Sequence, residues 1–182
     1  MPPEPLNKES PPHRVSASPR LRPVQKLWNQ IILLLATGMG VGHSPVMPGT
    51  VGSLWGIPLV WGLQESGLNP MLQGAAAGLL ILLGIPICSQ AAKLLQKEDP
   101  GAIVFDEIAV FPIVFAVVPV NVTTAILGFL WFRLFDVTKL WPVSVFDRWH
   151  GGLGIMTDDL VAGVYAALAL WLTMQVPGIG IS

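Results

Sequence analysis

FRLFDVTKLWPVSVFDRWHGGLGIMTDDLVAG, residues Phe132 to Gly163, packs acids, bases and glycines into a short segment between two strongly apolar stretches. Even on the more lenient insertion scale, a charged side chain at the centre of a bilayer costs about 2.5–3.5 kcal/mol. A chain with few charges does not concentrate them beside apolar stretches by accident. We interpret the segment as lying at the boundary between membrane and water, where its polar side chains carry out chemistry on a membrane-resident molecule.

The composition of the whole chain indicates an integral membrane protein. Hydrophobic residues make up 52% of the 182 residues and charged residues only 12%, whereas soluble domains carry about 25% charged residues. Mean hydropathy is +0.63. The net charge of −1 gives no attraction to nucleic acid. A single cysteine, Cys88, excludes an internal disulfide and a cysteine metal cluster, and its apolar surroundings predict a small buried residue.

The first 25 residues differ from the rest of the chain. They contain seven prolines and scattered polar residues, which is typical of a disordered leader. No small-residue cleavage site follows their basic part, as it would in a secretory signal. The basic residues at positions 8, 14, 20, 22 and 26 favour a cytoplasmic segment held against anionic lipid. We therefore divide the chain into a disordered cytoplasmic leader, 1–25, and a single membrane-embedded catalytic domain, 26–182.

Six apolar stretches follow the leader, and they predict an all-α fold. They cover residues 27–42, 51–64, 70–92, 107–119, 121–135 and 159–177. Only the third and the last reach the ~20 residues needed to cross a bilayer, and the first is interrupted by glycines. We predict a polytopic helical membrane protein with about five spanning helices and one N-terminal helix that is interfacial or re-entrant.

The distribution of Lys and Arg predicts the orientation. All ten lie in three places, namely residues 8–26, Lys93 with Lys97, and residues 133–148. If the stretch 27–42 does not cross, every one of them falls on the cytoplasmic side. If it does cross, the second and third groups face outside instead. The first arrangement, which we adopt, brings three polar segments together on the cytoplasmic face.

The first polar segment is GHSPVMPGTVGSLWGIPL, Gly42 to Leu59. Pro48-Gly49 predicts a turn, Thr50 a helix N-cap, and Ser53 a residue of the first helical turn. Free N–H groups at a helix start, with two hydroxyls beside them, form a ready anion site. The simpler interpretation is a loop that only begins a helix.

The second polar segment contains two adjacent acids, Asp106 and Glu107, at the start of an apolar stretch. Acids in a first helical turn gain a few tenths of a kcal/mol from the helix dipole. That effect accounts for one exposed acid better than for two acids flanked by apolar residues, so we expect metal or catalytic roles. Neighbours on a helix point about 100° apart, so one acid could bind metal while the other supports it.

The third polar segment is the one quoted above. Arg133 and Asp136 are three residues apart and can share a helix face, which also allows a purely structural ion pair. Its other polar and glycine positions are Lys139, Asp147, Arg148, Gly151, Gly152, Gly154, Thr157, Asp158 and Asp159. The glycines allow close backbone approach to an anion, and Thr157 is expected to cap the final helix.

Clustered carboxylates without a cysteine or histidine cage suit a hard cation such as Mg²⁺. Nearby Arg and Lys side chains suit phosphate. Together they form a set that can hydrolyse or transfer a phosphoryl group. A cysteine phosphatase is excluded because Cys88 has no CxxxxxR context, and the aspartyl-phosphate signature DxDx(T/V) is absent.

These residues carry a resemblance. SPVMPGTVGSLWGIPL, IVFDE and the quoted 32-residue segment are similar to the motifs of the phosphatidylglycerophosphatase A family of bacterial membrane enzymes, and they sample residues 40–180. The resemblance implies Mg²⁺-dependent removal of the terminal phosphate of phosphatidylglycerophosphate, which gives phosphatidylglycerol. It also implies a multi-pass protein of the bacterial inner membrane, with a phospholipid substrate and an active site facing the cytoplasm.

The residues and the resemblance together give the expected site. The expected catalytic residues are Asp106, Asp136, Asp158 and Asp159. The expected metal ligands are Asp106, Glu107, Asp158 and Asp159. The expected substrate-binding residues are Thr50, Ser53, Arg133, Lys139, Arg148, Gly151 and Gly152. The sequence leaves open which carboxylates bind metal, whether water or an aspartate attacks phosphorus, and the oligomeric state.

Two positions depart from the family pattern. Val110 replaces an expected glycine, which should change helix packing, and Leu140 replaces an expected proline, which should loosen a turn. Neither change removes a charge.

Two other functions are alternatives. A small transporter or cation channel needs acids spaced along the membrane depth. A lipid phosphotransferase has a motif to which TDDLVAG bears a superficial likeness only.

Overall fold

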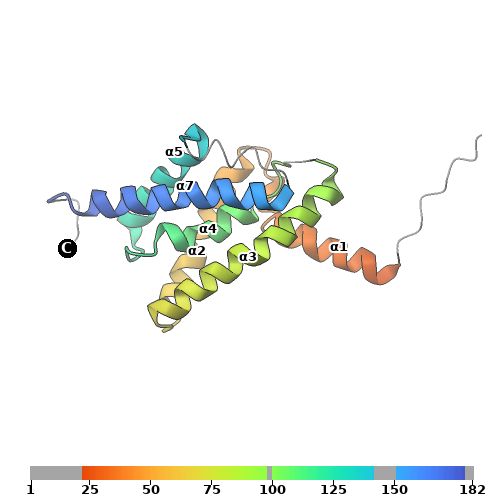
Figure 1. Cartoon of the computed structure of the whole chain (residues 1–182), viewed down its shortest axis with the longest axis horizontal. Coiled ribbons are helices and arrows are strands. Elements are labelled where there is room, and N and C mark those ends of the chain that lie inside the picture. The colour runs from red at the N-terminus through yellow and green to blue at the C-terminus, as the bar shows by residue number, and fades with distance from the viewer. Residues whose placement is uncertain (1–21, 98–99, 142–150, 179–182) are drawn as a thin grey trace, which may run out of the picture.

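The computed structural model describes residues 22–97, 100–141 and 151–178, and every regular element in these ranges is a helix (Figure 1). The elements are α1 (Pro23–Ala36), the short 3₁₀ helix η1 (Val41–His43), α2 (Pro48–Glu65), α3 (Pro70–Leu95), α4 (Phe105–Val114), α5 (Val122–Thr138) and α7 (Gly151–Met174). The all-α prediction is confirmed for this part of the chain. Residues 1–21 of the expected leader lie outside the described residues, and α1 already begins at Pro23.

Local sequence explains where most of these helices begin. Proline is the first residue of α1, α2 and α3, a position where its missing N–H costs nothing and its fixed φ suits the helix. At the start of α5, the Asn121 side chain accepts a hydrogen bond from the Thr124 N–H, and the Thr124 hydroxyl accepts one from the Asn121 N–H. This reciprocal capping satisfies two backbone donors that the helix itself leaves unpaired.

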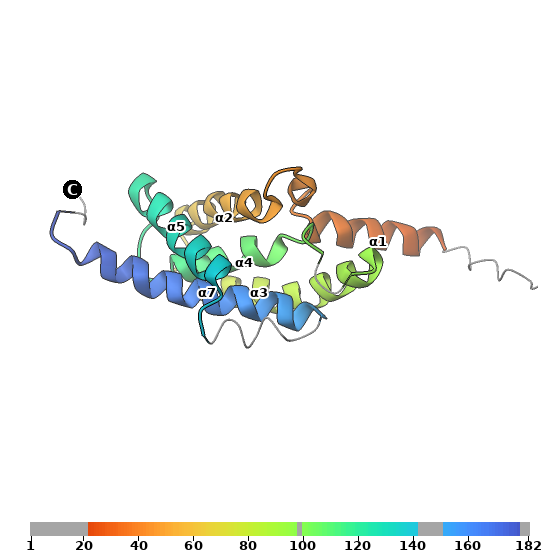
Figure 2. The same ribbon diagram turned by 90° about the horizontal axis from the view of Figure 1, so that it is seen from above.

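The short helix α4 lies at the centre of the bundle and contacts α2, α3 and α7 (Figures 1 and 2). It links two buried hydrophobic clusters. Phe111 belongs to the cluster shared with α5 and α7, in which its ring meets Phe132 edge-to-face with centroids 5.2 Å apart. Ala109 belongs to the cluster built around Cys88 and Met156. Because residues of α4 belong to both clusters, packing in both clusters fixes the position of the two acids at the start of this helix.

Two glycines allow neighbouring helices to approach α4 closely. A Cβ at Gly56 of α2 would collide with the Phe111 side chain, and a Cβ at Gly163 of α7 would lie 2.5 Å from Val110. Val110 is the residue that departs from the family pattern, and it is 1% exposed. The change in helix packing that we expected from Val110 therefore concerns the contact of α4 with α7, where the isopropyl group of Val110 packs into the space that Gly163 leaves open.

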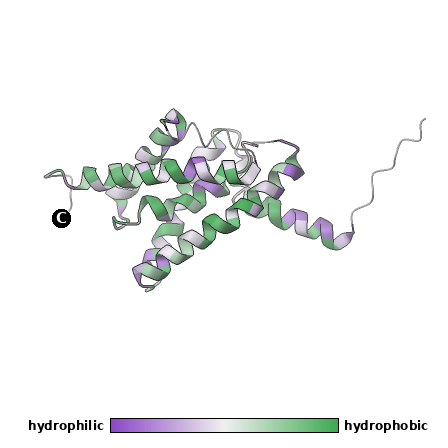
Figure 3. Cartoon of the chain, in the orientation of Figure 1, coloured by the Kyte–Doolittle hydropathy of each residue, from purple (hydrophilic) through white to green (hydrophobic). Residues whose placement is uncertain are grey.

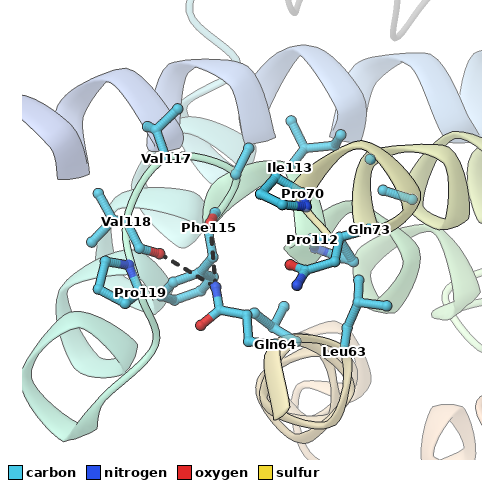
Figure 4. Close-up of a pocket in the computed structure, with 14 residues that line it drawn as sticks. Leu63, Gln64, Pro70, Gln73, Pro112, Ile113, Phe115, Val117, Val118 and Pro119 are labelled. Atoms are coloured by element: carbon cyan, nitrogen blue, oxygen red, sulfur yellow. Dashed lines mark hydrogen bonds between the residues drawn. The ribbon is translucent and has the colours of Figure 1, made fainter. Parts of the chain in front are cut away.

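At about 15 Å, the ten residues of α4 are too short to cross a bilayer as a helix. The chain continues past α4 alongside α2, because Glu107 contacts Ser53 near the start of α2 and Val120 contacts Gln64 near its end. Gln64 Oε1 accepts a 2.8 Å hydrogen bond from the Val120 N–H. Its amide nitrogen lies 3.5 Å from the carbonyl oxygens of Phe115 and Val118 (Figure 4). One side chain thus binds three backbone groups of the non-helical connection.

Among the described residues, two helices, α3 and α7, are long and apolar enough to span a membrane. Only 17% of the most apolar window of α3 is buried in the protein, and apolar residues follow the visible faces of both helices (Figure 3). Leu79, Leu82 and Leu168 are among the exposed large apolar residues. At about 27 Å or slightly less, α2 and α5 fall just short of the ~30 Å hydrocarbon thickness. The expected number of about five spanning helices stays a prediction.

The packing of Gly56 against Phe111 gives a test of the central position of α4. We expect Gly56→Ala to destabilise the protein by about 1–3 kcal/mol, because the added methyl group overpacks the α2–α4 contact. Gly62→Ala, on the same helix with nothing within 4 Å of the new Cβ, should be neutral or slightly stabilising. Thermal unfolding of both variants in the same detergent checks this, and equal stability of the two would contradict the proposed packing.

Candidate active site

A largely buried carboxylate, Glu107, joins three helices at the site. It lies in the first turn of α4. Its Oε2 accepts hydrogen bonds from the Ser53 hydroxyl of α2 and, at 3.1 Å, from Nη1 of Arg133 of α5. The same Nη1 lies 2.8 Å from Oδ2 of Asp136. Removing one partner of a buried ion pair costs about 3–5 kcal/mol because the other charge is left uncompensated, so the contact of α2, α4 and α5 depends on all of these partners being present.

The amino end of α2 lies against this carboxylate. A Cβ on Gly49 would collide with the Glu107 carboxylate, so glycine lets the first turn come close to the acid. The N–H groups of a first turn have no partner within their helix and favour an anion. In this structure Glu107 provides that negative charge. The sequence predicted an anion site at this helix start. In the structure the anion that lies against it is the carboxylate of Glu107, a residue of the protein itself.

The hydroxyl groups of Thr50 and Ser53 do not have all the roles that the sequence predicted for them. Thr50 is not the N-cap, because α2 begins at Pro48 and Met47 is the capping residue. The Thr50 Oγ1 atom is buried and has no hydrogen-bond partner among the described residues. Ser53 is fully buried and donates to Glu107. Of the two hydroxyls expected to bind substrate, the one at Thr50 has hydrogen-bonding capacity left.

The adjacent acids Asp106 and Glu107 have different surroundings. Glu107 faces α2 and α5, as its contacts show. Asp106 is 9% exposed, and both its charge and that of Asp159 of α7 act electrostatically on Cys88, buried in α3. This divergence follows from the 100° turn per residue of a helix. The two acids that the sequence grouped as metal ligands therefore serve different parts of the site.

Asp158 and Asp159 lie two turns inside α7, because this helix begins at Gly151. The expectation that Thr157 caps the helix is wrong: its hydroxyl donates to the Leu153 carbonyl oxygen within the same helix. Lys139, at the end of α5, donates from Nζ to Asp158 Oδ2 at 3.3 Å. Asp159 is 4% exposed, and its Oδ2 has no hydrogen-bond partner in the described part of the chain.

Five carboxylates gather at this end of the bundle. Asp159 interacts electrostatically with four others, namely Asp106, Glu107, Asp136 and Asp158. With Arg133 and Lys139 beside them, the formal charge of the group is −3 when all are ionised. The sixth described acid, Glu65, lies at the opposite end of α2. In the described residues, acids are not spaced along the membrane depth as an ion pathway would need.

The donor set fits a hard divalent cation. Carboxylate oxygens are the ligands that Mg²⁺ takes. The buried Oδ2 of Asp159, which has no hydrogen-bond partner among the described residues, would gain one from such an ion. No three His, Cys, Asp or Glu side chains of the described residues are close enough to hold a metal by themselves. Mg²⁺ usually keeps several waters and is bound through one or two carboxylates plus substrate phosphate. Asp159 with one neighbouring acid would meet that requirement.

The glycines at the start of α7 pack against α3. The Gly152 N–H donates to Ser89 Oγ at 2.9 Å, and a Cβ at Gly152 would collide with the Ile85 carbonyl oxygen. Gly151 has φ +72°, a backbone conformation that favours glycine. The Gly152 N–H, expected to bind substrate, is thus already paired within the protein. Arg148, the remaining expected substrate ligand, lies outside the described residues.

Ser89 is a site-proximal residue that the sequence analysis missed. It lies near the end of the long apolar helix α3, where a serine followed by glutamine resembles an ordinary solvated helix end. Its partner is 63 residues away in sequence. No local signal connects the two positions, and only the contact of α3 with α7 reveals the pair.

Sequence comparisons with known proteins match the chain to one enzyme family. The family model described as phosphatidylglycerophosphatase A matches residues 34–174. The phosphatidylglycerophosphatase A of Escherichia coli is 41% identical over 163 residues, which cover 88% of this chain and 91% of that protein. The enzyme of the same name from Haemophilus influenzae is 36% identical over 143 residues, covering 77% and 86%.

A third relative carries a different name. A Bacteroides thetaiotaomicron protein, provisionally named a phosphatidylinositol-3-phosphatase, is 35% identical over 151 residues, covering 77% of this chain and 94% of that protein. No solved structure matches the chain. The family match includes every described site residue discussed above, from Thr50 to Asp159. By this match, and by 41% identity over most of its length, the chain belongs to the phosphatidylglycerophosphatase A family.

Proposed function

We propose that this protein is a membrane phosphatase that hydrolyses the terminal phosphate monoester of phosphatidylglycerophosphate. In the net reaction the bond from phosphorus to the glycerol oxygen would break, water would supply the new oxygen on phosphorus and a proton to the glycerol oxygen, and phosphatidylglycerol and inorganic phosphate would be released. The observation that carries the proposal is the meeting of buried acids from α4 and α7 with the cations Arg133 and Lys139 of α5. The relatives named phosphatidylglycerophosphatase A support the substrate.

The side chains divide into two groups in this proposal. Arg133 and Lys139, at the end of α5, would bind the phosphate oxygens, since guanidinium and ammonium groups suit phosphate. Asp159, with Asp106 or Asp158, would hold Mg²⁺. When bound, this ion would neutralise phosphate charge and help to activate or orient the attacking group. Asp136 keeps Arg133 in place through its 2.8 Å ion pair.

We further propose that the protein is a multi-pass protein of the bacterial inner membrane with its site on the cytoplasmic side. The exposed apolar residues of α3 and α7 support contact with lipid, since exposed apolar patches of this extent are unusual on soluble monomers. The clustering of all Lys and Arg residues on one predicted side supports the orientation. A cytoplasmic site at the interface would meet the headgroup of a lipid in the inner leaflet.

A second substrate has a specific observation in its favour. The Bacteroides thetaiotaomicron relative is named for phosphatidylinositol 3-phosphate rather than phosphatidylglycerophosphate. Both lipids carry a phosphate monoester on a polar headgroup, so the cluster described above could act on either. We therefore include both lipids in the experiments below, and preferential hydrolysis of the inositol lipid would replace the substrate in our proposal.

The activity test uses the purified full-length protein in mixed micelles of detergent and lipid. We expect Mg²⁺-dependent phosphate release from phosphatidylglycerophosphate, loss of release with chelator and recovery when Mg²⁺ is returned. Asp159→Asn should lower kcat/KM by about 10²-fold or more, because it removes a charged ligand of the metal and loss of even an outer partner of a metal site costs about 10–100-fold. Glu65→Gln, an acid-to-amide change at the far end of α2, is the matched control and should keep full activity.

Two results would count against this proposal. Wild-type activity in Asp159→Asn would remove Asp159 from the site. Metal flux through liposomes without any phosphate release from either lipid would point instead to the transport function considered above. Thermal unfolding of each variant distinguishes a loss of chemistry from a loss of fold.

The orientation gives a second prediction. Glu65 and Lys97 are exposed and flank α3, and the natural Cys88 is completely buried. We expect a cysteine introduced at Lys97 to react with a membrane-impermeant thiol reagent only from the cytoplasmic side of sealed vesicles. A cysteine at Glu65 should react only from the opposite side. Reaction of both from the same side would show that α3 does not cross.

A further inference from the structure

We propose that Glu107 is a positioning residue that orients Arg133 for the substrate phosphate, rather than a metal ligand. The inference rests on the proposed phosphatase function. It changes the role expected for Glu107 from the sequence, where the adjacent acids Asp106 and Glu107 were grouped as candidates for the metal. The chemical partner that it assigns to Glu107 is a guanidinium group within the protein, and that group in turn would bind the phosphate monoester.

The contacts of Glu107 support this role. Its Oε2 atom accepts from two donors, the Ser53 hydroxyl and Arg133 Nη1. Its Oε1 atom faces Gly49, in the first turn of α2, where the helix N-terminus favours negative charge. The carboxylate is thus surrounded by hydrogen-bond donors and positive charge from two helices. A divalent cation in the same place would be repelled by Arg133.

Arg133 is held from two directions. Glu107 lies 3.1 Å and Asp136 2.8 Å from the same terminal nitrogen, Nη1. The Asp136 contact comes from one turn further along α5, whereas the Glu107 contact comes from α4. Of these two ion pairs, the one with Glu107 therefore fixes Arg133 relative to the helix that carries the buried acid Asp106. A planar guanidinium held in this way presents its remaining donors in a fixed direction.

Asp159 provides the contrast. It is 4% exposed, its Oδ2 has no hydrogen-bond partner among the described residues, and its neighbours include four other carboxylates. Such surroundings favour a bound cation beside the ionised Asp159 carboxylate, whereas the Glu107 carboxylate already has a cation in Arg133. The difference predicts that metal affinity depends on Asp159 and that the position of the substrate-binding cation depends on Glu107.

The test compares Glu107→Gln with Asp159→Asn, using Glu65→Gln as the control. Mn²⁺ titration followed by electron paramagnetic resonance measures metal binding without relying on activity. We expect Glu107→Gln to bind Mn²⁺ with wild-type affinity and Asp159→Asn to bind it much more weakly. In phosphate release, Glu107→Gln should raise KM about 10-fold or more, as expected for a weakened charged hydrogen bond, with a smaller change in kcat.

Coupling to Arg133 is measured by a double-mutant cycle. If Glu107 acts through Arg133, adding Glu107→Gln to Arg133→Lys should cost little beyond Arg133→Lys alone, because lysine cannot reproduce the bridged guanidinium. Losses in kcat/KM that simply multiply would overturn the positioning role. So would Mn²⁺ binding that weakens in Glu107→Gln as much as in Asp159→Asn.

A second variant covers the case in which Glu107→Gln does not fold. Ser53→Ala keeps both charges and removes one donor to Glu107, and we expect it to raise KM while leaving Mn²⁺ affinity unchanged. An unchanged KM would overturn the proposal. The two levels of inference fail separately: a folded wild-type protein that hydrolyses neither lipid contradicts the proposed function. An active wild type whose Glu107→Gln variant loses Mn²⁺ contradicts only the role of Glu107.

Discussion

The cost of placing carboxylates inside an apolar helix bundle shapes this protein more than any other constraint. Asp106 and Glu107 lie in the first turn of a helix that packs against α2, α3 and α7, and both acids are largely shielded from water. Each must therefore find positive charge or hydrogen-bond donors inside the protein. Glu107 finds them in Ser53 and Arg133. This requirement ties α2, α4 and α5 together at one end of the bundle and leaves α7 to bring the remaining acids.

Much of the arrangement could be predicted from the sequence because charge is so scarce in it. When most charges of an apolar chain lie in a few short segments, those segments are expected to meet. The contacts of Ser53, Glu107, Arg133 and Lys139 show that parts of all three polar segments do. The helical class likewise followed from long apolar stretches. The roles of individual side chains, including Asp136 and Asp158 as catalytic residues, remain predictions.

The features of the structure that could not be predicted from the sequence are those that depend on tertiary contacts. The glycines 151, 152 and 154 looked like an anion-binding loop, and Thr157 looked like a cap, because glycine weakens a helix in isolation. In the folded protein Gly152 lets α7 pack directly on Ser89 of α3, and this contact overrides the local preference. Helix geometry predicted that Asp106 and Glu107 point in different directions, but the residues that each acid meets depend on how α4 packs in the bundle, which the sequence does not show.

The connection after α4 has a consequence for how this family can vary. A full-length spanning helix would satisfy its own backbone, but here the polypeptide leaves helical geometry partway and relies on the amide of Gln64 for three of its backbone groups. Irregular backbone at membrane depth is tolerated only where protein or water serves its polar groups. We therefore expect the last turn of α2 and the segment 115–120 to vary together within the family. A substitution at one should require a compensating change at the other, at the end of α2 opposite the candidate site.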